Sequence, residues 1–104
     1  MTQRQQTFEC GMRPIHPGEI LRDELEGLGL SARAFAKALS IPVNRVTQIL
    51  NEQRGISADT ALRLARYFGT SAEFWMDLQS DYELRRARHE VGEVIIRAVI
   101  PRAA

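Results

Sequence analysis

The chain has 104 residues, of which 44% are hydrophobic and 26% charged, a size and composition typical of one globular domain with a single core. No apolar run approaches the ~20 residues that a membrane-spanning helix needs, and the polar start of the chain lacks the apolar segment of a secretory signal. Cys10 is the only cysteine, which excludes an intrachain disulfide and a paired-cysteine zinc site. We therefore expect a cytoplasmic protein without membrane association.

The net charge of +1 is spread unevenly along the chain. Residues 31–71 carry six basic and two acidic side chains, a local charge of +4, whereas the segments on either side are slightly acidic. All the cations except Lys37 are arginines, whose planar guanidinium suits phosphate and guanine. A basic centre between acidic ends is the pattern expected when one face of a protein meets phosphate.

The polar stretch 1–13 has no periodicity, so we expect a flexible N-terminal arm there. A first helix is expected to begin near His16, because Pro17 suits the first turn of a helix, and to end at Gly29, which tolerates the left-handed conformation. Its expected buried residues are Ile20, Leu21, Leu25 and Leu28.

Two short helices joined by a very tight turn come next. Ser31 is the expected cap of a helix that ends at Ser40, and Pro42 begins a second periodic stretch that runs to Leu50. Helices joined by so few residues cannot lie antiparallel and must cross steeply, which is the geometry of a helix-turn-helix. The expected inward residues of the pair are Phe35, Ala36, Leu39, Val46, Ile49 and Leu50.

A turn-rich loop at 51–57 precedes a fourth expected helix. This helix is expected to begin at a Ser57 or Asp59 cap and to stop at Gly69. Its expected buried residues are Ala61, Leu62, Leu64, Ala65 and Phe68.

A fifth helix is expected from a Thr70 or Ser71 cap toward Arg88, with a stripe of core residues at helical spacing, part of which could lie in a dimer seam. That stripe consists of Trp75, Leu78 and Tyr82. Beyond Gly92 the β-branched residues before Pro101 favour a short strand over a helix. We therefore expect an all-α, five-helix domain over 14–90 and a tail over 91–104 that could pair two copies of the chain.

The outer face of the third expected helix carries side chains that suit the edges of bases. They are Val43, Asn44, Thr47 and Gln48. Gln and Asn amides can bind adenine through two hydrogen bonds, while Val and the Thr methyl group can contact the thymine methyl group. The residues expected at backbone phosphates are Arg33, Lys37, Arg45, Asn51 and Arg54. A polar face that is merely solvated is the alternative, and the tight turn together with the local charge of +4 favours DNA binding.

Segment 31–51 resembles the core of lambda-repressor-like (XRE) helix-turn-helix domains. The stretches 12–21, 55–57, 61–65 and 74–79, together with Tyr82, are similar to the pattern of HigA (VapI-like) antitoxins. The opening His-Pro-Gly-Glu-Ile-Leu and the later Trp-x-x-Leu-Gln are the most specific parts of the pattern. The resemblance covers nearly all of residues 12–86.

This resemblance implies a lambda-repressor-like fold and a dimer that binds an operator at its own promoter. It also implies that the protein neutralises a small HigB-type, ribosome-dependent ribonuclease toxin encoded beside it. By position, Val43, Asn44, Thr47 and Gln48 match the base-reading residues of the family, and Arg33, Arg45 and Asn51 match the phosphate-contacting ones. The chain departs from the family at Pro42, where a Ser or Thr usually caps the recognition helix, so we expect no side-chain cap there.

The first expected helix carries three acidic residues on one face, Glu19, Asp23 and Glu26. An acidic stripe could dock a basic toxin, and the alternative is an ordinary solvated charged face.

We expect no enzymatic activity, cofactor or metal, because the sequence has no Gly-rich phosphate loop, no nucleophile elbow and no metal-spaced His or Cys set. Two other functions remain open on the sequence alone. One is a stand-alone transcription regulator without a toxin. The other is a protein-binding adaptor that keeps the fold and has lost DNA recognition, which bulky or acidic residues on the outer face of the third helix would have supported.

Overall fold

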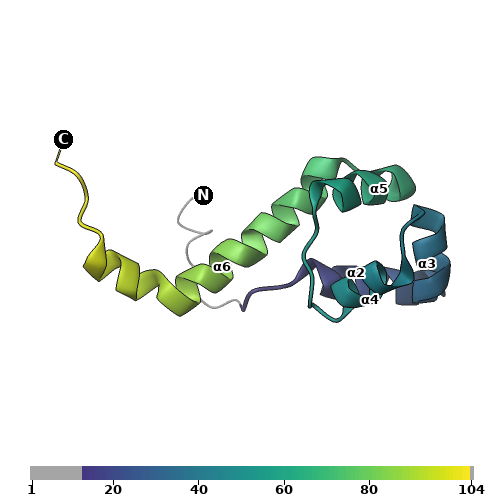
Figure 1. Cartoon of the computed structure of the whole chain (residues 1–104), viewed down its shortest axis with the longest axis horizontal. Helices are drawn as coiled ribbons and strands as arrows, with labels where there is room; N and C mark the ends of the chain where they lie inside the picture. The colour runs from purple at the N-terminus through teal and green to yellow at the C-terminus, as the bar shows by residue number, and fades with distance from the viewer. Residues whose placement is uncertain (1–12, 104) are drawn as a thin grey trace.

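A computed structural model of the chain describes residues 13–103, and over this range it contains five helices and no strand. They are α2 (Pro17–Leu28), α3 (Ala32–Leu39), α4 (Val43–Leu50), α5 (Ala58–Phe68) and α6 (Ala72–Ala98). The predicted all-α fold is confirmed (Figure 1). The predicted N-terminal arm lies outside the described residues, apart from Arg13.

The helix ends are defined by local capping chemistry, as the sequence predicts. The hydroxyls of Ser31, Ser57 and Ser71 each accept a hydrogen bond from the backbone N–H three residues on, at 3.1, 3.3 and 3.1 Å. Gly29 and Gly69 close α2 and α5 in the left-handed conformation, at φ 68° and 74°.

An imidazole caps α2. Nδ1 of His16 accepts a hydrogen bond from the N–H of Gly18 at 2.8 Å, and the ring lies edge-on to Tyr82 of α6 with centroids 4.8 Å apart. His16 is 3% exposed, and this burial lowers its pKa below the ordinary value. The neutral ring therefore joins the start of α2 to the middle of α6.

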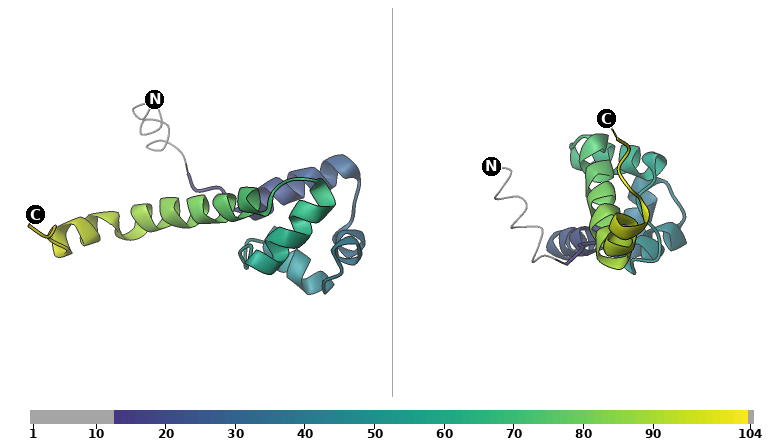
Figure 2. Two further views of the ribbon diagram at one scale, coloured as in Figure 1. Left: turned by 90° about the horizontal axis from the view of Figure 1, so that it is seen from above. Right: turned by 90° about the vertical axis from the view of Figure 1, so that its left-hand side faces the viewer.

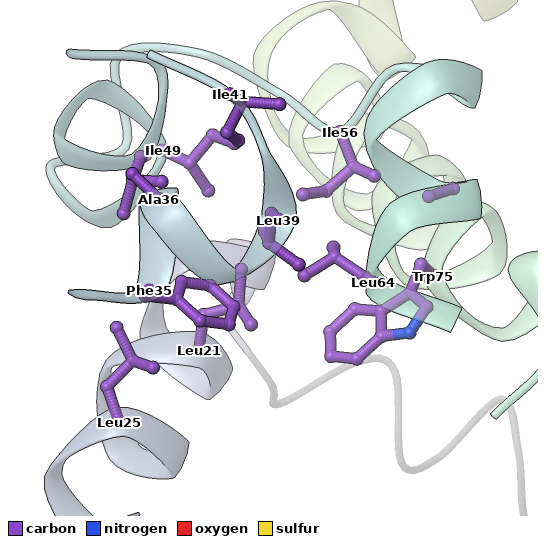
Figure 3. Close-up of a cluster of buried hydrophobic side chains, with 12 residues drawn as sticks. Leu21, Leu25, Phe35, Ala36, Leu39, Ile41, Ile49, Ile56, Leu64 and Trp75 are labelled. Atoms are coloured by element: carbon purple, nitrogen blue, oxygen red, sulfur yellow. The ribbon is translucent and has the colours of Figure 1, made fainter. Parts of the chain in front are cut away.

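One hydrophobic core lies between α2–α5 and the first turns of α6 (Figure 3). Its buried members are Leu21, Leu25, Phe35, Ala36, Leu39, Ile41, Val46, Ile49, Ile56, Ala61, Leu64 and Trp75. Two leucines predicted to be buried are exposed instead, Leu28 at 54% and Leu62 at 63%. Leu62 lies about 100° around the helix from Ala61 and outside the buried face, while Leu28 is the last residue of its helix, where little of the fold covers it.

The predicted strand near the C-terminus is wrong, because α6 continues as a single helix of 27 residues to Ala98 (Figure 1). A helix that has nucleated on a packed first half extends at little cost, even through β-branched residues. Ion pairs four residues apart support it further. They are Asp81–Arg85 at 2.8 Å, Arg86–Glu90 at 2.9 Å and Glu93–Arg97 at 3.7 Å.

The second half of α6 projects from the rest of the fold (Figure 2). It gives the molecule a length of 53 Å, against 26 and 23 Å in the other two directions. Among residues 13–103, none of the helices combines the length and the apolarity needed to cross a membrane.

Candidate nucleic-acid interface

The turn between α3 and α4 is closed by its own backbone. Ser40 takes the left-handed conformation, at φ 58° and ψ 48°. The N–H of Ile41 reaches back to the carbonyl of Ala36 at 3.0 Å, which ends α3 abruptly, and the Ile41 side chain is only 8% exposed. The predicted helix-turn-helix is therefore present.

Arg63 of α5 braces this turn. Its Nη1 donates to the carbonyls of Leu39 at 2.9 Å and Ser40 at 3.2 Å, groups at the end of α3 that lack partners within the helix. Sequence reasoning missed Arg63, because the contact joins residues that are far apart in the chain and leaves no periodic signal.

The orientation of α4 is set by two core residues, Val46 and Ile49, each 2% exposed. The residues predicted to read bases lie outside the core as exposed or half-buried side chains on this helix: Val43, Asn44, Thr47 and Gln48. Pro42 gives α4 no side-chain cap, as expected. The sequence thus identified a set of side chains that the fold brings together on one helix.

The hydroxyl of Thr47 is already engaged within α4. Its Oγ1 donates to the carbonyl of Asn44 at 3.1 Å. With its only donor hydrogen used by the backbone, Thr47 has its methyl group and the oxygen lone pairs left for a ligand. This chemistry fits a thymine methyl group better than a base acceptor.

Arg45, predicted to bind phosphate, is held by an acidic partner. Its Nη1 lies 3.0 Å from the carboxylate of Asp59, which also accepts a hydrogen bond from Nε of Arg63 at 2.7 Å. The Arg63 hydrogen bond, followed by that of Arg45, lowers the pKa of Asp59 below its ordinary value. One carboxylate therefore offsets part of the positive charge beside α4.

Arg54, also predicted to bind phosphate, donates from Nε to Oε1 of Gln48 at 2.9 Å. A predicted phosphate contact and a predicted base reader are thus joined directly. The spacing of six residues does not predict this pair, because residue 54 lies in a loop beyond the end of α4.

The other predicted phosphate contacts are exposed. Arg33 and Lys37 lie one turn apart on α3, and Asn51 follows the last residue of α4. Long exposed cations close to a protruding helix can reach a phosphate backbone on either side of it.

The acidic face of α2 is more structured than the sequence suggested. Glu19 receives hydrogen bonds from Arg13 at 2.7 and 3.0 Å, and the Arg13 hydrogen bond lowers the pKa of this carboxyl. Asp23 and Glu26 are exposed on the following turns. The predicted acidic stripe is present, with its first member already paired.

A buried amide fixes the loop between α4 and α5. Oε1 of Gln79, a residue 7% exposed, accepts the backbone N–H of Ile56 at 2.8 Å. Gly55 passes so close that a Cβ there would lie 2.6 Å from Gln79 Nε2. Gln79 belongs to the Trp-x-x-Leu-Gln segment, which was the one sequence signal that could have assigned it this role.

A second close approach holds α2 against α4. A Cβ at Gly18 would collide with the carbonyl oxygen of Ile49, and Arg22 donates to the carbonyl of Leu50 at the end of α4. Both contacts fix the C-terminal end of α4. Among residues 13–103, no group of His, Cys, Asp and Glu side chains is arranged to hold a metal ion.

Comparisons with known proteins agree with this architecture. The helix-turn-helix family model matches residues 21–75, more than half of the chain. The virulence-associated protein I of Dichelobacter nodosus is 52% identical over 91 residues, which span 86% of this chain and 82% of that protein.

Solved structures give the same result at the level of the fold. An addiction module antidote protein of the HigA family from Coxiella burnetii is 55% identical, with a TM-score of 0.85 over 88% of this chain and 100% of that one. The Pseudomonas aeruginosa antitoxin HigA, solved with the higBA promoter, is 53% identical, with a TM-score of 0.84 over 88% of this chain and 100% of the other.

These proteins are DNA-binding antitoxins and regulators, and theirs is not a family of enzymes. The matches cover nearly the full length of the solved relatives, so they apply to the whole fold and not only to the helix-turn-helix. The chain belongs to the XRE-type helix-turn-helix family of DNA-binding transcription regulators and, within it, to the HigA (VapI-like) antitoxins.

Proposed function

We propose that this protein binds operator DNA as a dimer through the outer face of α4, represses the operon that encodes it, and neutralises a ribonuclease toxin by direct binding. The observation that carries the DNA part is the outer face of α4, on which the polar Asn44, Thr47 and Gln48 lie beside Val43. The related Pseudomonas aeruginosa antitoxin was solved with promoter DNA, which supports the same ligand here.

The positive charges around α4 support a position of this helix against DNA, in which the neighbouring cations contact backbone phosphates. Arg33 and Lys37 are exposed on α3 of the helix-turn-helix, and residues 31–71 carry the positive excess of the chain. Contacts to phosphate place a protein on the duplex without reading its sequence, so these cations would orient α4 while its own side chains select bases.

The distal part of α6 supports pairing of two chains. Leu84, Val91 and Val94 are 54%, 42% and 55% exposed, and with Ala87 and Ala98 they form a stripe with alternating spacings of three and four residues. This is the spacing of a helix that packs along another helix. We call it the α6 stripe. An exposed apolar surface of this kind marks an interaction site, and a second copy would also supply the second α4 that a dyad operator needs.

The exposed carboxylates Asp23 and Glu26 are our candidates for toxin contact, because a ribonuclease that binds RNA carries basic surface. Glu19 is part of the same predicted stripe, and its pairing with Arg13 makes it the least available of the three.

DNA binding is tested by fluorescence anisotropy with a fragment from upstream of the gene and a scrambled fragment of equal length. Gln48→Ala should weaken binding to the specific fragment by about 1–3 kcal/mol and leave binding to the scrambled one nearly unchanged. The matched variant Arg33→Ala should weaken both and reduce the salt slope by about one. Equal losses on both fragments for Gln48→Ala would remove α4 from base reading.

Toxin binding is tested by co-expression of the tagged chain with the protein encoded beside it. The two should co-purify, and the double variant Asp23→Lys, Glu26→Lys should lose the partner while it still binds operator DNA. Operator binding without any protein partner would identify a stand-alone regulator. A protein partner without DNA binding would identify an adaptor.

A further inference from the structure

The orientation of the Gln48 amide decides which bases it can select. A glutamine amide has an accepting oxygen on one side and a donating nitrogen on the other. Adenine presents an acceptor and a donor to the major groove, so it needs both ends of the amide, whereas guanine presents two acceptors, N7 and O6, and needs two donors.

Arg54 fixes this orientation. Its Nε donates to Oε1 of Gln48 at 2.9 Å. A guanidinium has only donors, so the flipped amide would place two N–H groups against each other. The stable arrangement therefore keeps Oε1 turned toward Arg54 and leaves Nε2 of Gln48 to meet a ligand.

The loop that carries Arg54 is anchored on both sides of it, which fixes the backbone of Arg54 beside Gln48. The N–H groups of Glu52 and Gln53 donate to the carbonyls of Ile49 and Gln48, at 3.0 and 2.8 Å. After Arg54, Gly55 passes against Gln79, and the N–H of Ile56 binds Oε1 of Gln79 at 2.8 Å. Arg54 therefore starts from a fixed backbone position beside the end of α4.

We propose that Arg54 determines specificity through Gln48, and that together they form a donor-only edge that selects guanine over adenine in each half-site. Nε2 of Gln48 supplies one donor and the terminal nitrogens of Arg54 supply the other. The inference rests on the proposed function, because it requires α4 to read bases. It changes the sequence-based assignments of both residues, since glutamine alone suited adenine and Arg54 was expected only at a phosphate.

The test measures the affinity of the full chain for operator variants in which each base pair of a half-site is replaced in turn. The position read by Gln48 is the one whose preference disappears in Gln48→Ala. At that position we expect wild-type protein to prefer guanine over adenine by about tenfold or more. Arg54→Met keeps the side-chain length and removes the donors, so the preference should fall below about threefold, mainly through a gain in adenine binding.

Two controls separate an effect on base choice from a loss of charge. Arg33→Met removes an exposed cation elsewhere on the helix-turn-helix, and it should lower affinity for all operator variants alike. The double variant Gln48→Ala, Arg54→Met should show no loss of preference beyond that of Gln48→Ala. Since Arg54 is exposed, its replacement leaves the core intact, which circular dichroism can verify.

The possible failures are distinguishable. A wild-type protein with no base preference at any position would overturn the proposed function itself. A wild-type preference for adenine at the Gln48 position, or a guanine preference that survives Arg54→Met, would overturn only the inference. A uniform loss of affinity in Arg54→Met, like that of Arg33→Met, would also overturn it and would leave Arg54 as a phosphate contact.

Discussion

Along α6 the buried side chains lie before Tyr82, whereas the apolar residues after it are exposed. In the first part Trp75 and even the polar Gln79 are 3% and 7% exposed. In the second part Ile95 and Ile96 are 50% and 74% exposed. Burial along α6 therefore depends on whether the rest of the fold covers a side chain, and not on the polarity of that side chain. The exposed part is where we propose that a second chain packs.

Two leucines on α5 differ in burial in the same way, and their replacement should give the largest difference in stability. Leu64 is 0% exposed and Leu62 is 63% exposed. Leu64→Ala should lower the free energy of unfolding by about 2–5 kcal/mol, because it leaves a cavity in the core. Leu62→Ala should change it by less than about 0.5 kcal/mol. Urea unfolding at one fixed protein concentration measures both, and similar losses would mean that Leu62 is buried in the protein as it exists in solution.

A charge in the α6 stripe should disrupt the proposed pairing of two chains. Val94→Asp should convert the proposed dimer to a monomer of 11.8 kDa and lower operator affinity by about 100-fold or more, since two linked α4 helices bind far better than one. His89→Asp places the same charge on the opposite side of the helix and should do neither. Light scattering after size exclusion measures the mass. A Val94→Asp protein that remains dimeric would show that the chains pair elsewhere.

The contact between His16 and Tyr82 lies where α6 leaves the core, and it should respond to pH. Burial lowers the pKa of His16 below 6.5, so between the two values the unfolded chain binds more protons than the folded one. The stabilisation is complete above about pH 6.5 and is lost as pH falls through the lowered pKa.

His16→Asn provides the matched variant, because Asn also caps helices and does not titrate in this range. Between pH 7.5 and pH 5.5 wild-type protein should lose up to about 1 kcal/mol more stability than the variant, the typical contribution of an N-cap. Urea unfolding at the two pH values checks this. Identical pH dependence of the two proteins would remove His16 as the titrating group.

The smallest expected effect is the change in DNA affinity when the carboxylate of Asp59 on α5 is removed. Asp59→Asn removes the carboxylate that holds Arg45 at 3.0 Å, so affinity for random DNA should rise about two- to threefold and the salt slope should steepen by about one. Asp81→Asn removes an equivalent charge on α6 and should leave both quantities unchanged. Weaker binding by Asp59→Asn would mean that the carboxylate positions Arg45 for phosphate and does not compete with it.

Features set by neighbouring residues could be predicted from the sequence. Ser31, Ser57 and Gly29 define helix ends through their own backbone and nearest turns, and the outer face of α4 follows from helical periodicity around Val46 and Ile49. These signals lie within a few residues of each other, so no tertiary information is needed.

The strand prediction for the end of α6 is wrong because β-branched residues favour a strand only weakly, and a helix that is already packed continues through them. The ion pairs that support the helix were visible in the sequence, as opposite charges four residues apart at Arg86–Glu90 and Glu93–Arg97. They are the signal that could have corrected the prediction.

The contacts that determine the chemistry of the candidate site could not be predicted. Arg45–Asp59 and Gln48–Arg54 join residues from different elements, and Arg63 reaches the turn from α5. Such pairs depend on how the helices cross, which single-sequence periodicity does not specify. The set of side chains on the outer face of α4 was therefore predictable, and the pairing among them and their neighbours was not.

DNA recognition by α4 is tested most directly by selection of binding sites from random double-stranded DNA with the full-length protein, followed by the same selection with Gln48→Ala. We predict an enriched site with dyad symmetry whose half-sites lie about 34 Å apart, or a multiple of that distance, and a loss of preference at one position per half-site for the variant. Enrichment of no sequence, or of a site without a dyad, would contradict recognition by a pair of α4 helices.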